Sequence, residues 1–561
     1  MPPDNPIGFG ASDSLELAVA FLLVLGVLFA RPLLEPYAAK FAARTGWCML
    51  TLALLPICLR LLLLPNHPVP FPDVYDEFSH LLVADTLRHF RFANPTHAMQ
   101  QFFETFFVLQ QPTYSSIYPL GQGLVLTLGW AGVLLSIGAF CALCYWMLRA
   151  WTTPLWALVG GLLAVIEFGP LNQWMNSYWG GAVAATAGCL VFGALPRLRE
   201  SGQVRHGALL GAGIGLHLLT RPFESVFLVS SVMAFLLPEA RRFMRPAVAA
   251  MLAVAPAMVI ILVQNRQITN SWTTLPYALS QYQYGVPTTL TVEPNPTPHV
   301  DLTPQQQMDY RMQRSFHGEG TDTVGNYFVR LEYRIRFFRF FLLAPLYLAV
   351  PWFLIKLREF RFLWVALTLL LFAVGSNFYP FFQPHYIAAV SCLLILVAVV
   401  GLNELNRLSG ESARVVLLLS FAYFGLWYAV HVFDTRDFSV ALRRYETWDA
   451  INHQNPERRR LVNEQLARTP GRKLIFVRYL PQHIFQEEWV WNRADIDSAQ
   501  NVWARDLGPA ENEKLQHYYP DRAAWLLEPD VLPPRLSHYE PPPAVSPPSA
   551  NPFITPQLVN P

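Results

Sequence analysis

Residues 46–77 read GWCMLTLALLPICLRLLLLPNHPVPFPDVYDE, an apolar run followed by a proline-rich stretch and an acidic pair. The first part of this stretch, 46–64, has the length and composition that cross the hydrocarbon core of a bilayer. The acids, Asp76 and Glu77, follow a short distance beyond it. This order predicts a membrane protein with polar chemistry at one surface of the bilayer.

The composition of the whole chain is that of a polytopic α-helical membrane protein. Of its 561 residues, 53% are hydrophobic and only 14% are charged, whereas an average soluble protein has about 25% charged residues. Apolar runs predict about twelve transmembrane helices. They are 14–31, 46–64, 119–148, 153–170, 179–195, 207–220, 223–237, 247–264, 340–355, 362–379, 385–402 and 415–432. The six cysteines lie inside such runs, which argues against a disulfide framework, and the net charge of +2 does not indicate a nucleic-acid partner.

Lysine and arginine recur in every second connection between the spans. The short connections on the opposite side are 1–13, 171–178, 221–224 and 380–384, and Arg221 is their only cation. Because cytoplasmic loops retain positive charge, we expect both termini and the long polar segments on the outer side. These segments are 65–118, 265–339 and 433–561. The short cytoplasmic connections leave no room for a nucleotide-binding domain, and no Walker-type glycine loop is present.

The segment around the acidic pair predicts a helix. Residues from Val74 to Phe90 contain neither glycine nor proline, and Asp73, Asp76 and His80 then share one helix face. Neighbouring carboxylates beside a membrane suit general-base catalysis or the binding of a divalent cation. The alternative is a solvated helix start, since acidic residues favour the first turn.

Other polar and aromatic residues converge on the same surface. Phe102, Phe103, Phe106 and Phe107 predict a short helix that lies in the lipid interface. Aromatic and amide side chains suit sugar binding, and arginine suits phosphate, although an aromatic belt or an Arg221–Glu224 pair are structural alternatives. The candidate substrate-binding residues are His80, Gln111, Tyr118, Trp174, Asn176, Tyr178, Arg221, Glu224, Arg334, Arg336, Tyr379 and His385.

A span, an outer loop with Asp-Glu and a helix, further spans and an outer C-terminal domain together resemble the GT-C superfamily of integral membrane glycosyltransferases. The nearest branch resembles the bacterial relatives of protein O-mannosyltransferases and of the lipid A aminoarabinose transferase. The motif that carries the resemblance is Asp76-Glu77 within DEFSHLLVADTL. The resemblance implies a GT-C-like fold in the inner membrane. It also implies inverting transfer of a sugar from a polyprenyl-phosphate-linked donor to an unidentified lipid, glycan or protein acceptor at the periplasmic face.

The same resemblance assigns roles to individual residues. Asp76 would be the general base, and Glu77 would orient the site or bind the acceptor. Arg221, with Arg334 or Arg336, would hold the leaving phosphate. Some relatives have a further acid in the second outer loop, where this chain has 176–177, Asn-Ser. No cofactor is therefore certain, and a divalent metal stays open.

Three regions are expected along the chain. Residues 1–435 form the transmembrane module, 436–528 a small outward-facing α/β domain that covers the site or selects the acceptor, and 529–561 a proline-rich tail. Two other functions stay open. A secondary transporter predicts repeated halves and ionisable groups inside the spans. A non-catalytic cell-envelope assembly protein predicts that loss of both acids is tolerated.

Overall fold

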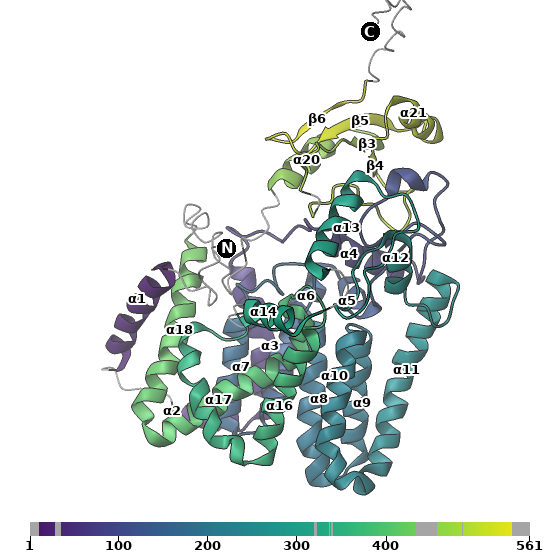
Figure 1. Ribbon diagram of the computed structural model, residues 1–561. Coiled ribbons are helices and arrows are strands. Elements are labelled where there is room, and N and C mark those ends of the chain that lie inside the picture. The colour runs from purple at the N-terminus through teal and green to yellow at the C-terminus, as the bar shows by residue number, and fades with distance from the viewer. Residues whose placement is uncertain are drawn as a thin grey trace, which may run out of the picture.

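The computed structural model describes residues 11–28, 35–318, 322–335, 337, 340–433, 451, 457–484 and 486–540. Most of these residues are helical, and the long helices run side by side in a bundle (Figure 1). The helices of the bundle are α1 (Ala11–Leu28), α2 (Glu35–Ala42), α3 (Thr45–Leu62), α6 (Trp130–Leu148), α7 (Pro154–Phe168), α8 (Ala182–Ser201), α9 (Val204–Leu218), α10 (Pro222–Leu236), α11 (Met244–Thr269), α16 (Phe360–Ser376), α17 (Ser391–Leu408) and α18 (Gly410–Val432).

Six helical stretches in the described part of the chain are long and apolar enough to cross a membrane. They are Thr45–Leu62, Trp130–Leu148, Ala182–Ser201, Met244–Thr269, Pro384–Leu408 and Gly410–Val432. Three apolar helices are shorter: Pro154–Phe168, Pro222–Leu236 and Phe360–Ser376. The protein is therefore an integral membrane protein.

Two of the predicted spans are interrupted. The prediction of one span over 340–355 is wrong, because this stretch is divided into η4 (Ala344–Leu348), α15 (Val350–Phe353) and η5 (Leu354–Arg358). Pro345 and Pro351 lie in it, and proline lacks the N–H that a continuous helix requires. The predicted span 119–148 consists of α5 (Leu120–Leu126) and α6, which are separated at Gly129, where φ is +63°.

The centre of the bundle is the helical stretch Pro384–Leu408, which ends in α17, because 94% of its apolar 18-residue window is buried. Only 11% of the corresponding window of α11 is buried, so α11 stands at the edge. The start of this central stretch, η6 (Pro384–Val390), packs closely on α8. A Cβ atom at Gly188 would lie 1.8 Å from the carbonyl oxygen of Ala389, so only glycine permits this approach. The contact fixes the segment that carries His385.

The polar segments gather at one end of the bundle, which we call the loop side (Figure 1). The first segment contains α4 (Tyr75–Arg88), η1 (Gln100–Phe103) and a hairpin of β1 (Val108–Leu109) and β2 (Ser115–Ser116). The second contains α12 (Pro276–Tyr284), α13 (Pro304–His317) and α14 (Val324–Ile335). The C-terminal sheet lies above both (Figure 1).

The C-terminal domain is a mixed sheet with two helices, α20 (Glu457–Arg468) and α21 (Pro509–Tyr518). Its strands are β3 (Lys473–Val477), β4 (Asn501–Arg505), β5 (Ala523–Glu528) and β6 (Arg535–His538), in the order β4-β3-β5-β6. β3 is parallel to β4 and β5, and β6 is antiparallel to β5. The sheet therefore extends into the segment predicted as a tail, of which 541–561 lie outside the described residues.

The phenylalanines predicted in the lipid interface are buried in the protein. The exposed fraction is 9% or less for Phe102, Phe103, Phe106 and Phe107. The first two belong to a core with Leu474 and Phe476 of β3, and the other two pack on Tyr75. The interfacial prediction is wrong because other parts of the protein, rather than lipid, cover their apolar surface. The C-terminal domain covers Phe102 and Phe103, and Tyr75 packs against Phe106 and Phe107.

Candidate functional site

Asp76 lies in the first turn of α4 and points its carboxyl group at two donors. The Tyr118 hydroxyl donates a hydrogen bond to Oδ1, and the Trp179 side chain donates another. Burial raises the pKa of Asp76 from 3.8 to about 6, while the two hydrogen bonds and the nearby charge of Arg221 lower it. The group is thus ionised at neutral pH and more basic than an ordinary aspartate, as a general base requires.

Glu77 points in a different direction and is fully buried. Its Oε2 accepts hydrogen bonds from the backbone N–H groups of Asp73 (3.0 Å) and Val74 (3.4 Å), and Oε1 accepts one from Tyr178 (2.9 Å). Burial raises the pKa of Glu77 to about 7 against the effect of these bonds. The side chain caps α4 and ties it to the loop between α7 and α8, so its oxygens are occupied by the protein itself.

We expect Glu77→Ala to lower the free energy of unfolding by more than about 2 kcal/mol. The substitution leaves the buried N–H of Tyr178 and the part-buried N–H groups of Asp73 and Val74 without their acceptor, and the loss of a buried acceptor costs about 1–3 kcal/mol. Glu77→Gln keeps one acceptor oxygen and should fall between Glu77→Ala and the wild type. Thermal unfolding of the purified variants measures the effect.

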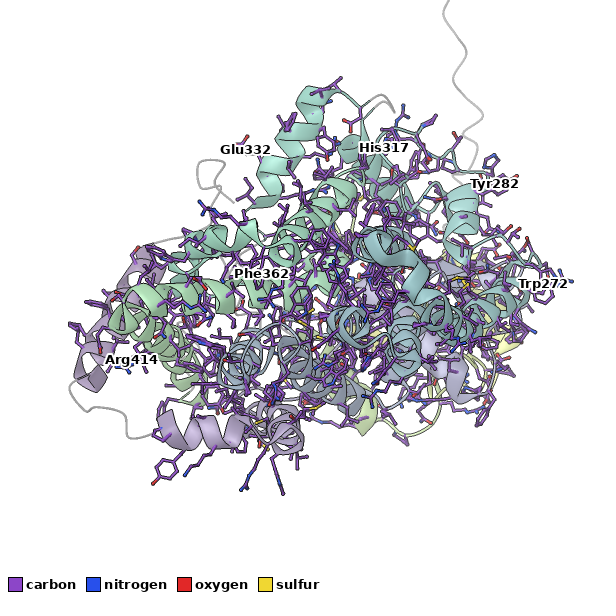
Figure 2. All side chains as sticks on the ribbon, turned by 90° about the horizontal axis from the view of Figure 1, so that it is seen from below. Trp272, Tyr282, His317, Glu332, Phe362 and Arg414 are labelled. Carbon is purple, nitrogen blue, oxygen red and sulfur yellow. The ribbon has the colours of Figure 1, made fainter. Side chains whose placement is uncertain are left out.

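The matched control for this measurement is Glu332→Ala. Glu332 is exposed and lies at the periphery of the molecule on α14 (Figure 2). Its removal should leave the unfolding temperature unchanged. Equal unfolding temperatures for Glu77→Ala and Glu332→Ala would contradict the capping role of Glu77.

Arg221 is the cation of the site and occupies the N-cap position of α10, where its side chain makes no capping hydrogen bond. Its guanidinium lies 4.9 Å from the centre of the Tyr386 ring and interacts electrostatically with Asp76 and His80. Among the described residues the guanidinium has no hydrogen bond, and no ion pair joins it to Glu224, which is buried in the same helix turn. The positive charge is therefore available to an anionic ligand.

Two imidazoles line the same space. The His80 ring stacks on Tyr118 at 4.1 Å, and both of its buried nitrogens lack a partner in the described part of the chain. Burial lowers the pKa of His80 to about 3, with Arg221 acting in the same direction, so the ring is neutral at pH 7. The His385 ring packs between Trp179 (5.3 Å) and Tyr386 (4.9 Å). Neutral imidazoles can donate one hydrogen bond to a ligand and accept another.

Asp309 brings a second carboxyl group to the site, and sequence reasoning missed it. It lies on α13 and is fully buried. Oδ2 accepts a hydrogen bond from Gln313 (3.0 Å), and Oδ1 has no partner among the described residues. Burial raises its pKa to about 7, and the charge of Asp76 adds to the shift. The one sequence signal near Asp309 is the capping box at Thr303 and Gln306. It marks the start of the helix but does not indicate where the Asp309 side chain points.

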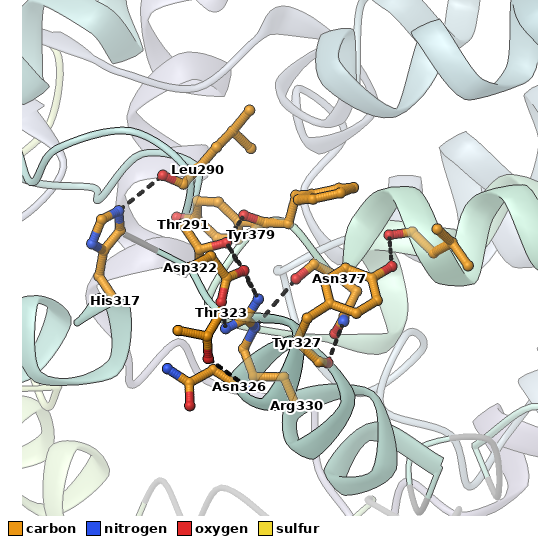
Figure 3. Close-up of polar contacts among 12 residues, drawn as sticks. Leu290, Thr291, His317, Asp322, Thr323, Asn326, Tyr327, Arg330, Asn377 and Tyr379 are labelled. Carbon is orange, nitrogen blue, oxygen red and sulfur yellow. Dashed lines mark hydrogen bonds and ion pairs between the residues drawn. The ribbon is translucent and has the colours of Figure 1, made fainter. Parts of the chain in front are cut away.

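Tyr379 reaches the site from the turn after α16. Its hydroxyl lies 2.9 Å from that of Tyr277, which comes from the second polar segment. α14 holds this turn: Arg330 pairs with Asp322, its Nε donates to the Asn377 carbonyl (3.3 Å), and Asn377 donates to the Tyr327 carbonyl (2.8 Å) (Figure 3). The network fixes the turn of Tyr379 relative to α14.

Several of the predicted substrate-binding residues bind the protein's own groups instead. Trp174 stacks on Phe168 inside the bundle. Asn176 accepts a hydrogen bond from Arg60 (2.6 Å), and Arg334 donates to the carbonyls of Ser376 (2.8 Å) and Tyr379. The structure thus gives these three residues supporting contacts around the site.

The remaining predicted residues are placed as follows. The Tyr178 hydroxyl donates to the Pro70 carbonyl (2.9 Å), which adds to the contact of its backbone with Glu77. Gln111 is exposed, and its carbonyl accepts a hydrogen bond from Gln283. Arg336 lies outside the described residues. Over the parts of the chain described, no group of three or more His, Cys, Asp or Glu side chains is suited to hold a metal ion.

The C-terminal domain contacts α4 directly through hydrogen bonds. The Trp491 indole donates to the Phe78 carbonyl (3.0 Å), and the Ala494 N–H donates to Asp85 (2.8 Å). The Asp73 carbonyl, just before the helix, accepts from the Glu488 N–H (3.3 Å). The domain therefore holds the helix that carries Asp76.

No protein-family model matches this sequence, and a search of curated proteins finds no match. Among solved structures, the chain is similar to ArnT from Cupriavidus metallidurans in the apo state, at 12% identity and a TM-score of 0.48 over 87% of this chain and 93% of that one. ArnT bound to undecaprenyl phosphate is similar at 12% identity and a TM-score of 0.46 over 78% and 83%. The Archaeoglobus fulgidus oligosaccharyltransferase in complex with Zn and sulfate has 12% identity and a TM-score of 0.46 over 86% and 67%. All three identities are 12%, and all three TM-scores lie below 0.5.

Proposed function

We propose that the protein is a membrane glycosyltransferase that moves a sugar from a polyprenyl-phosphate-linked donor to an acceptor at the loop side of the bilayer. The observation that carries this proposal is that Asp76 and Arg221 lie in one half-buried site at the loop side and interact electrostatically. The Asp76 carboxyl has a raised pKa, and the Arg221 guanidinium has no ion-pair partner among the described residues. Sugar transfer from a phosphate requires two groups, a base that takes the acceptor proton and a cation that binds the leaving phosphate.

The reaction is a single displacement. The acceptor hydroxyl or amine attacks the anomeric carbon, the bond from that carbon to the phosphate oxygen breaks, and Asp76 takes the acceptor proton. The leaving phosphate gains the negative charge, which Arg221 stabilises. Attack from the side opposite the leaving group inverts the configuration. Tyr118 and Trp179 hold the Asp76 carboxylate in one orientation throughout.

The other polar groups bind the sugar and acceptor. Asp309 and Tyr379 present oxygens from the second polar segment and from the turn after α16, and His80 offers two unpartnered ring nitrogens. Glu77 acts as a positioning residue, since its oxygens hold backbone N–H groups of α4 and of the neighbouring loop. The charge distribution of the loops supports an outer, non-cytoplasmic position of the loop side. The resemblance to GT-C glycosyltransferases implies that this is the periplasmic face of the inner membrane.

Donor cleavage in nanodiscs tests the proposal. Wild-type protein is incubated with a panel of sugar-linked polyprenyl phosphates and cell-envelope lipids, and released polyprenyl phosphate is quantified. We expect release from at least one donor by wild type and none from a sample inactivated by heat. Movement of intact donor between leaflets without cleavage would instead support a transporter, and folded wild type that cleaves no donor would overturn the proposal.

A further inference from the structure

The helix α14 has two faces of opposite character, and its apolar face is turned away from the protein. Val324, Phe328, Leu331 and Ile335 follow one another at intervals of four, three and four residues, so they form one stripe along the helix. Val324 (75%), Phe328 (60%) and Ile335 (55%) are largely exposed. This orientation is the reverse of the one that a helix on a water-soluble surface adopts.

The polar face of α14 is turned toward the bundle. Arg330 is held in the network described above, and Arg334 is buried and donates a hydrogen bond to the carbonyl of Ser376 (2.8 Å). The Tyr327 hydroxyl donates to the carbonyl of Val374 (2.8 Å) (Figure 3). Val374 and Ser376 belong to the last turn of α16. α14 therefore lies at the loop-side end of that apolar helix.

The axis of α14 runs across the bundle rather than along it. In the side view, α14 crosses the long helices near their loop-side ends (Figure 1). In the view from below, where the long helices are seen along their axes, the helix beside Glu332 extends sideways at the edge of the molecule (Figure 2). A helix with this orientation at this depth lies parallel to the bilayer surface.

The exposed stripe of α14 continues an apolar surface of α16. Leu363, Leu367 and Leu370 are exposed at intervals of four and three residues along α16. Beyond the end of α16, Phe378 is partly exposed, and its ring packs on that of Tyr327 at 5.2 Å. A continuous apolar surface of this kind marks a region that another apolar phase covers. Since α16 belongs to the membrane bundle, the phase that covers its outer surface is lipid.

We propose that the outward face of α14 is embedded in the loop-side leaflet of the bilayer, where the interfacial part of the lipids is its partner. The exposed Glu332, which lies beside the stripe, favours lipid over a second protein chain. A protein interface would bury this carboxylate, which is costly without a cation to pair with it. At the bilayer surface, the side chain can extend to the water of the headgroup region.

An embedded α14 would link the bilayer to the candidate site. The helix holds the turn after α16 through Arg330 and Asn377, and this turn carries Tyr379. The depth of α14 in the leaflet would therefore set the depth of Tyr379 relative to the membrane surface.

The accessibility of spin labels in nanodiscs tests the proposal without any sugar substrate. A nitroxide is attached to the full chain at Phe328→Cys, with Cys58→Ser removing the exposed native thiol. Its collision rates with oxygen, which concentrates in lipid, and with a water-soluble nickel chelate are then measured. The label should show the high oxygen and low nickel accessibility of a lipid-facing reference, Leu367→Cys on α16. Val324→Cys should behave in the same way.

Two exposed positions outside the stripe supply the matched controls. Asn326→Cys lies on α14 on the side opposite Phe328, and Leu461→Cys lies on α20 in the C-terminal domain. Both labels should be readily accessible to the nickel chelate. Equal nickel accessibility at position 328 and at these controls would overturn the proposal, since the stripe would then meet water. Low accessibility of position 328 to both oxygen and nickel would also overturn it, because protein rather than lipid would then cover the stripe.

Discussion

Asp76→Asn should reduce the rate of sugar transfer about a thousandfold while the protein stays folded. The amide keeps the size of the side chain but cannot take a proton from the acceptor. General-base catalysis contributes about 10²–10⁴ to a rate, so its loss should fall in this range. Released polyprenyl phosphate, measured with the donor that the wild type cleaves, gives the rate.

The pH dependence of the transfer rate tests whether Asp76 is the general base. Because its pKa is raised to about 6, the wild-type rate should fall as the pH drops below that value. The residual rate of Asp76→Asn should lack this limb. The control is Asp301→Asn, which makes the same change at an exposed position of the second polar segment and should behave as wild type. More than a tenth of wild-type activity in Asp76→Asn would contradict the base assignment.

The raised pKa of Asp76 also predicts how Asp76→Asn changes the stability of the protein at alkaline pH. The folded protein binds the Asp76 proton more tightly than the unfolded chain does, since the pKa rises from 3.8 to about 6 on folding. The contribution of Asp76 to stability is therefore complete below about pH 4 and is lost as the pH rises through about 6. At pH 8, Asp76→Asn should consequently unfold at the same temperature as wild type or at a higher one.

The part of the fold that depends on local pattern could be predicted from the sequence. Run length and composition located the six helical stretches that are long enough to cross a membrane and three shorter apolar helices among the described residues. The absence of glycine and proline after Val74 located the helix of Asp76. Arg221 could be singled out because it is the only cation in the short connections on the outer side. The interruption of 340–355 could not be seen from mean hydropathy, which ignores the position of Pro345 and Pro351.

The errors concern surfaces that distant segments cover. Phe102 and Phe103 have the pattern of a lipid-facing helix, but β3 lies against them from more than 370 positions later in the chain. Asp309 is one acid in a polar segment, and only the packing of α13 against the site makes it part of the cluster. Glu77 looks equivalent to Asp76 in the sequence, yet one step along a helix turns its side chain toward backbone donors.

Arg221→Gln should lower the transfer rate about 10²–10³-fold, the range seen when one charge-stabilising group is removed from a transition state. The leaving phosphate would then gain its charge without the guanidinium. Arg221→Lys should recover part of the rate, because lysine keeps the charge but lacks the planar set of donors. The matched control is Arg311→Gln, an exposed cation on α13, which should transfer as wild type does.

The pH profile distinguishes loss of the phosphate ligand from a collapsed site. Arg221 lowers the pKa of Asp76 through its charge, so its removal should move the acid limb of the profile to higher pH. A variant that merely disorders the site would lose rate without this upward movement. If Arg221→Gln transferred at the wild-type rate, or if its acid limb moved to lower pH, the leaving phosphate would have to be held elsewhere. The pairing of Asp76 with Arg221 would then no longer support the proposed reaction.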